Sequence, residues 1–151
     1  MSAITTSTKS AMPLAHDRDI QNRSTANRSY PVFGMNEWQV AALRRIAQLS
    51  NLPMNWDTYG SVPISETVLD VASELVRGAS FDAAPAPRVV PVSGGGIQLE
   101  WQSGDRELDI QITPNLSFEL VARDQDFIEE VTTRALAPSS LAGLLSWLQG
   151  T

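Results

Sequence analysis

The chain of 151 residues is 42% hydrophobic, enough for one core, and its 17 acidic and 11 basic residues give a net charge of −6. With no cysteine and a single histidine, His16, in a segment expected to lie outside that core, the composition excludes disulfides, thiolate chemistry and histidine-based catalytic triads. Its acidity, and the absence of any apolar run near the roughly 20 residues of a membrane span, predict a cytoplasmic domain that binds neither nucleic acid nor membrane.

Residues 1–34 are the first predicted segment. They are rich in Ser, Thr and Asn, show no helical or strand periodicity, and hold four basic and two acidic residues. Such a composition predicts a flexible tail, either a solvated leader or an arm that folds on a partner. Residues 35–151 are then expected to form a single domain.

Two helices are predicted to open this domain. Asn36 is a good N-cap for the first, whose apolar stripe continues until Pro53 stops the helix. Ser65 is expected to cap the second helix, and Gly78 marks its C-terminal end. The proline-rich stretch 83–87 then predicts an extended linker into the sheet.

After a first strand at 88–92, the sequence predicts a β-hairpin whose register follows from its turn. Strands 96–103 and 106–112 are joined by Gly104 and Asp105, a glycine-first pair that suits a type II′ turn. Counting outward puts every apolar residue on one face, with Ile97, Leu99 and Trp101 opposite Ile112, Ile110 and Leu108. The other face pairs Gln102 with Glu107, Glu100 with Asp109, and Gln98 with Gln111. Opposed carboxylates are costly, so this face either tolerates strain or meets positive charge.

Two further strands and a helix complete the predicted fold. Residues 116–122 alternate as a strand, and 127–133 form a weaker one whose pattern also suits a helix. A last helix begins at Pro138 and ends at Gly150. This order predicts an α+β domain with two N-terminal helices, an antiparallel β-meander of four to five strands and a C-terminal helix. We expect the helices to cover one face of the sheet and to leave the acidic face open.

The acidic residues of the predicted sheet are the first candidate functional group. Nine acidic residues lie between positions 100 and 130, among them Glu100, Glu107, Asp109 and Glu119. An ordinary solvated strand face would account for them, since such charges also discourage aggregation. They equally suit a binding surface for a basic protein partner. A third interpretation is a divalent-metal site formed by Glu100, Asp109 and Glu119, because magnesium and calcium need only oxygen ligands.

The segment 55–63, which joins the two helices, is the second candidate. It combines aromatic and turn-forming residues at high density. In one interpretation Trp56 and Tyr59 pack between the helices and the sheet, while Asn55 and Asp57 satisfy backbone donors of the turn. In the other, the two aromatic rings form the floor of a site for a peptide or small ligand, and Asn55 and Asp57 supply its polar contacts.

Two motifs in the chain resemble those of a group of small bacterial proteins with the patterns N-W-D-G-Y-G and G-G-I-x-L-E-W. They are Asn55-Trp56-Asp57-x-Tyr59-Gly60 and Gly95-Gly96-Ile97-x-Leu99-Glu100-Trp101. The resemblance spans residues 35–131, and Thr58 departs from the glycine of the pattern. The group has no assigned activity, so the resemblance implies a self-contained domain in an accessory or neutralising role and carries over no catalytic residue.

These features predict a small non-enzymatic protein that binds a basic protein partner through an acidic sheet face, as an antitoxin, immunity or assembly-accessory protein would. The residues expected to contact the partner are Glu100, Glu107, Asp109, Glu119, Asn55, Trp56, Asp57 and Tyr59. No cofactor is expected. Two alternatives are a metal-dependent hydrolase using the sheet carboxylates and a structural subunit that self-associates through the helix 141–148.

Overall fold

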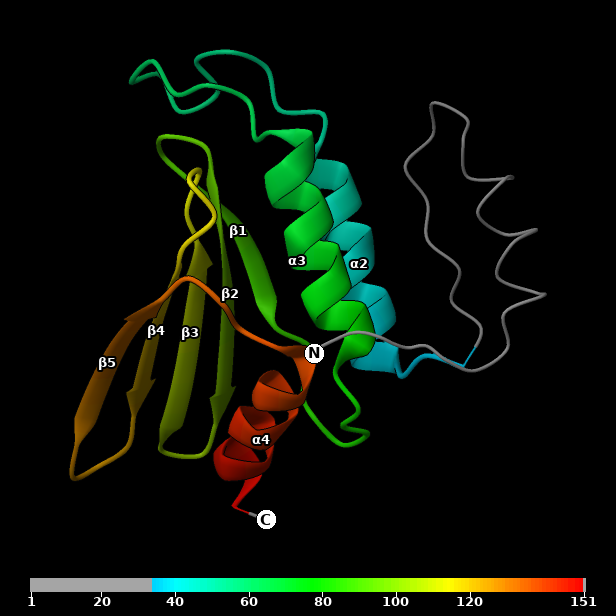
Figure 1. Ribbon diagram of the computed structural model, residues 1–151, viewed down its shortest axis with the longest axis vertical. Helices are drawn as coiled ribbons and strands as arrows, with labels where there is room; N and C mark the ends of the chain where they lie inside the picture. Colours follow the sequence, from blue (N-terminus) through cyan, green and yellow to red (C-terminus); the bar gives the residue numbers. More distant parts are fainter. Residues whose placement is uncertain (1–33, 151) are drawn as a thin grey trace. The chain divides into compact units, whose positions relative to one another are not determined.

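In the part of the chain that the structure describes, two helices precede the sheet and one follows it (Figure 1). The computed structural model describes residues 34–150. Its helices are α2 (Glu37–Leu49), α3 (Glu66–Gly78) and α4 (Pro138–Gln149). Its strands are β1 (Arg88–Val92), β2 (Gly96–Ser103), β3 (Arg106–Ile112), β4 (Phe118–Arg123) and β5 (Ile128–Thr133). The predicted α+β class is confirmed, with five antiparallel strands in meander order, and the predicted tail lies outside the described residues except for Gly34.

The hairpin of β2 and β3 has the register predicted from its turn. Every predicted pair is present, from Ser103 with Arg106 to Ile97 with Ile112. Gly104 has a φ of 59°, the left-handed value that the first central position of a type II′ turn requires. Because side chains alternate between the faces of a strand, the six apolar residues of the hairpin share one face, and all six are buried.

The three helices pack on this apolar face and leave the other face of the sheet uncovered (Figure 1). α2 contacts β1, α3 contacts β2, and α4 contacts both β2 and β3. Trp38 of α2 and Trp101 of β2 meet edge to face, with ring centroids 6.0 Å apart. Leu141, Leu145 and Leu148 of α4 are buried in the same core. The apolar face of this helix is therefore used inside the domain, which leaves the self-association alternative without its expected surface.

β4 and β5 lie beyond the strands that the helices mainly contact (Figure 1). β4 begins at Phe118 rather than at Leu116, because Leu116 has a φ of 68° and belongs to the preceding turn. The segment predicted as a weak strand is β5, so its helical alternative is wrong. Ile128 and Val131 of β5 are 63% and 45% exposed. The last strand is thus the least covered part of the sheet.

One buried side chain joins α2 to α3. Gln39, only 4% exposed, accepts a hydrogen bond from the Asn36 N–H at 2.9 Å through its side-chain oxygen. Its amide group donates to the carbonyls of Val76 and Ala79 at 2.9 and 3.2 Å. Gln39 therefore satisfies backbone groups at the start of one helix and at the end of the other. The predicted cap of α3 is also confirmed, since the Ser65 hydroxyl accepts a backbone N–H of the first turn at 3.2 Å.

Candidate binding surface

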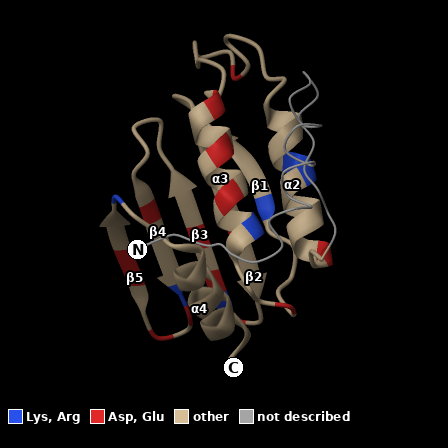
Figure 2. Ribbon diagram, turned by 45° about the vertical axis from the view of Figure 1, so that its right-hand side comes forward, with Lys and Arg blue, Asp and Glu red and all other residues tan. Residues whose placement is uncertain are grey.

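The sheet face opposite the helices, called the open face, is polar and acidic. The strand register places on it the charged residues Arg88, Glu100, Glu107, Asp109, Glu119, Arg123 and Glu130. Carboxylates thus outnumber guanidinium groups five to two among the strand residues of this face. Figure 2 shows acidic residues on β3, β4 and β5. The predicted arrangement, with the apolar face covered and the acidic face open, is the one observed.

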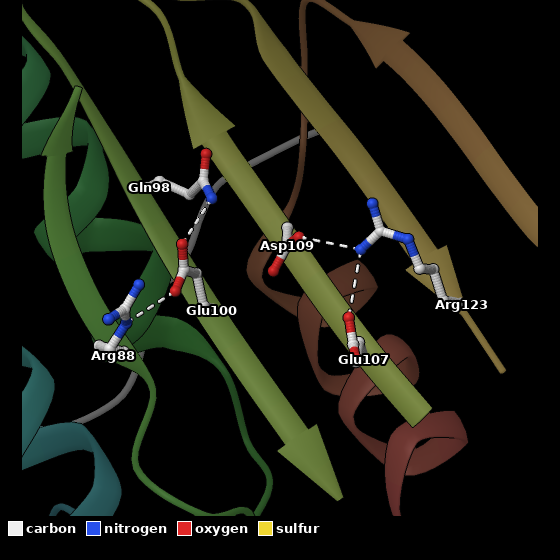
Figure 3. A network of polar contacts seen from close by, with 6 residues as sticks. All are labelled: Arg88, Gln98, Glu100, Glu107, Asp109 and Arg123. Atoms are coloured by element: carbon white, nitrogen blue, oxygen red, sulfur yellow. Dashed lines mark hydrogen bonds and ion pairs between the residues drawn. The ribbon is translucent and has the colours of Figure 1, made fainter. Parts of the chain in front are cut away.

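Three carboxylates of the open face form a group, called the carboxylate cluster: Glu100, Glu107 and Asp109. Glu100 on β2 lies opposite Asp109 on β3, and Glu107 precedes Asp109 by two residues on the same face. Two arginines reach the cluster from the neighbouring strands (Figure 3). Arg88 Nε donates to Glu100 Oε1 at 2.8 Å. Arg123 Nη1 lies 3.2 Å from Glu107 Oε1 and 3.5 Å from Asp109 Oδ2.

Asp109 is the least compensated carboxyl group of the cluster. Burial raises its pKa above the usual carboxyl range, and the charges of Glu100 and Glu107 add to this effect, while Arg123 opposes it. The contact of 3.5 Å with Arg123 is long for a hydrogen bond, and the same nitrogen also contacts Glu107. The cluster therefore carries more negative charge than its two arginines neutralise.

The carboxylate cluster borders a cleft of about 370 Å³ on the open face. The residues that line this cleft are Ala86, Arg88, Glu100, Trp101, Gln102, Glu107 and Asp109. Glu119 lies opposite Gln111 and does not line it. The metal interpretation thus lacks its third carboxylate, and within residues 34–150 no group of three or more His, Asp or Glu residues could hold a metal ion.

The loop 55–63 is organised around the carboxylate of Asp57. The N–H groups of Tyr59 and Ser61 donate to it at 2.9 and 3.1 Å, and the hydroxyls of Ser61 and Ser93 donate at 2.6 and 2.5 Å. The two serine hydroxyls, followed by the backbone donors, hold the pKa of Asp57 well below its usual range. Because Ser93 belongs to the turn between β1 and β2, this carboxylate ties the connection between the helices to the sheet.

The backbone-bonding interpretation of this loop is confirmed, but the expected packing of Tyr59 is wrong. Asn55 accepts a hydrogen bond from the Gly60 N–H at 2.6 Å, as Asp57 does from its own neighbours. Tyr59 is 90% exposed. Positive φ values of 61° at Asn55 and 64° at Thr58 direct this part of the chain outward instead of into the core. A ligand site floored by Tyr59 and Trp56 stays a prediction.

The two candidate groups lie at opposite ends of β1. Arg88, its first residue, contacts Glu100 of the carboxylate cluster. Ser93, just beyond its last residue, contacts Asp57 of the loop. The structure therefore separates the predicted residues into two surfaces and brings together only three of them, Glu100, Glu107 and Asp109, in one cleft.

No family model, curated protein or solved structure matches this chain. The resemblance of its two motifs to a group of small bacterial proteins stays a prediction. Within residues 34–150, none of the helices has the length and apolar character needed to cross a membrane.

Replacing Asp57 by asparagine is expected to flatten the loss of stability on acidification. A carboxyl group whose pKa is lowered by folding stabilises the protein above its unfolded-state pKa, and this contribution is lost as the pH falls toward the folded-state pKa. Urea unfolding at a series of acidic pH values should thus show a steeper decline for the wild type than for D57N. Ser93→Ala, which removes one of the hydroxyl donors, should lie between them. Parallel curves for all three proteins would contradict this role of Asp57.

Proposed function

We propose that the protein binds a basic protein partner through its open face, with the carboxylate cluster at the centre of the contact. The supporting observation is the position of Asp109, a partly buried carboxyl group between Glu100 and Glu107, in a cluster that has two arginines for three carboxylates. A lysine or arginine of the partner would complete this neutralisation, because charge-assisted hydrogen bonds to carboxylates are among the strongest polar contacts.

The cleft beside the cluster admits such a side chain. Its volume of about 370 Å³ is open to solvent on the side away from the helices. The side chain of Arg88 is 74% exposed, so its ion pair with Glu100 is screened and contributes at most about 1 kcal/mol. A partner can therefore replace this contact with a better desolvated one at little cost.

The charge of the whole chain favours the same class of partner. A net charge of −6 attracts a basic protein over a distance and speeds their encounter. Close contacts in the cleft would then fix the register of the complex. We propose an accessory role of the antitoxin, immunity or assembly type, because the recognition chemistry is that of a charged docking surface.

A pull-down from the native host, with the tagged full chain as bait and after nuclease treatment, tests this proposal. The expected result is a stoichiometric partner rich in Lys and Arg that is released at high salt, because the Debye length falls from about 10 Å at 0.1 M to about 3 Å at 1 M ionic strength and the attraction between exposed charges is screened. Bait carrying E100K/D109K should not retain it. Recovery of the bait alone, or equal retention by both baits, would refute the proposed surface.

A further inference from the structure

The fold protects one edge of the sheet. On β1 pairing is impeded at both outward residues, because Pro91 has no N–H and the Val89 carbonyl accepts a hydrogen bond from Arg45 Nε at 3.1 Å. α2 packs along the same strand. Proline, charged side chains, and a covering side chain or helix are among the means by which proteins prevent pairing at a strand edge.

The other edge, at β5, has no proline and no covering helix within residues 34–150, and its protection consists of charged side chains. β5 ends the strand order of the described sheet. The turn bond from the Asp124 N–H to the Phe127 carbonyl, at 3.1 Å, fixes which residues of β5 bond to β4. Alternation then directs the N–H and C=O groups of Ile128, Glu130 and Thr132 outward. These groups have no hydrogen-bond partner in the described part of the chain.

The side chains of β5 give this open edge a definite chemical character. Ile128 and Val131 are 63% and 45% exposed and lie on opposite faces of the sheet. Glu129 and Glu130 are exposed as well, again one on each face. If β5 of a second copy paired with this edge, the two glutamates of each strand would lie in one strand pair, and their like charges would destabilise it. A strand with basic residues would instead meet an opposite charge on either face.

We infer that β5 receives an extended basic segment of the partner protein as an additional strand. The inference rests on the proposed function for the charge of the partner and adds the way in which the partner is held. Main-chain hydrogen bonds to Ile128, Glu130 and Thr132 would supply affinity, as in other cases of recognition by strand addition. Apolar side chains of the added strand would cover Ile128 and Val131.

The probe for this inference is a short synthetic peptide that repeats Val-Lys-Lys-Val, with blocked ends, so that both faces of the added strand carry valine and lysine. It is added to the full chain. Strand addition should slow amide hydrogen exchange at Ile128, Glu130 and Thr132 by about tenfold or more at saturation, because each outward N–H gains a partner. The amides of Glu129 and Val131, which already bond to β4, should change far less. A peptide with the same side chains but N-methylated on every backbone amide has no edge that can donate, so it should leave exchange unchanged.

A proline substitution supplies the matched protein variant. Thr132→Pro removes one outward N–H without removing a bond to β4, and it should weaken peptide binding by about three- to tenfold. Thr132→Val keeps the N–H and should bind the peptide as the wild type does. Thermal melting of both variants shows whether each is folded, and the N-methylated peptide tests the same contact without any substitution.

The outcomes separate this inference from the proposed function. Peptide binding that perturbs the amide resonances around Asp109 but does not slow the outward amides of β5 would overturn strand addition and leave the proposed function standing. Absence of binding anywhere on the chain would overturn both. Equal slowing by the N-methylated peptide would also overturn strand addition, as would concentration-dependent protection of β5 in the protein alone, which indicates pairing of two copies.

Discussion

E100K/D109K is expected to lower the affinity for the basic partner by about 100-fold or more, which corresponds to roughly 2.8 kcal/mol. Glu100 and Asp109 face each other across β2 and β3, and both line the cleft of the open face. Each substitution removes an acceptor of charge-assisted hydrogen bonds and sets a like charge against the incoming side chain. Titration calorimetry with the purified partner at several salt concentrations measures this change, and the salt dependence should become flatter.

The matched control is Asp70→Lys with Glu74→Lys on α3. Both residues are exposed on a helix that covers the opposite side of the sheet, and the change in net charge is the same. This variant should slow association moderately and leave the dissociation rate nearly unchanged. If the two double variants weaken binding equally, only the net charge matters and the carboxylate cluster has no special part in recognition. Thermal melting of both variants verifies that they are folded.

The hairpin explains why much of the fold and part of the site could be predicted from the sequence. Gly104 fixes the turn, and strict alternation allows only one register that places every apolar residue on one face. The same register puts Glu100 opposite Asp109, so the core of the carboxylate cluster follows from local residues alone. The segregation of helices from strands then identifies the fold class.

Contacts between distant segments could not be predicted in this way. The contact of Arg88 with Glu100 depends on the pairing of β1 with β2, and that of Arg123 with Asp109 on the pairing of β3 with β4. Neither pairing was fixed by a turn that could be read as clearly as Gly104. Asp57 meets Ser93, 36 residues away, only because the fold brings two loops together at one end of β1.

Tyr59 shows a second limit of sequence reasoning. Tyr59 is a large aromatic residue in a segment between two helices, and residues of this kind are usually buried in part. The sequence alone therefore favours its burial. The local hydrogen bonds of Asp57 and the positive φ of Thr58 decide its direction instead, and they place the ring in solvent. In this short loop the side-chain to backbone bonds set the backbone conformation, and burial of the aromatic ring does not override them.

Gln39→Leu is expected to lower the free energy of unfolding by about 2 kcal/mol, because buried backbone groups lose their partners. The leucine side chain has a similar size, but it can neither accept from the Asn36 N–H nor donate to the carbonyls of Val76 and Ala79. Within residues 34–150, these carbonyls keep only turn bonds of 3.4 and 3.2 Å, and the Asn36 N–H has no other hydrogen-bond partner. Thermal melting should show a fall of roughly 8 °C.

Gln48→Leu is the control for this substitution, since it makes the same chemical change on the same helix. Gln48 is exposed, and among residues 34–150 its side chain has a hydrogen bond only with Arg45 Nη1, at 3.2 Å. Its replacement should change the stability by no more than about 0.5 kcal/mol. A difference between the two variants measures what a buried amide contributes by joining α2 to α3. If both variants melt at the same temperature, Gln39 fills space without holding the helices together. The position of α2 relative to α3 must then come from apolar packing alone.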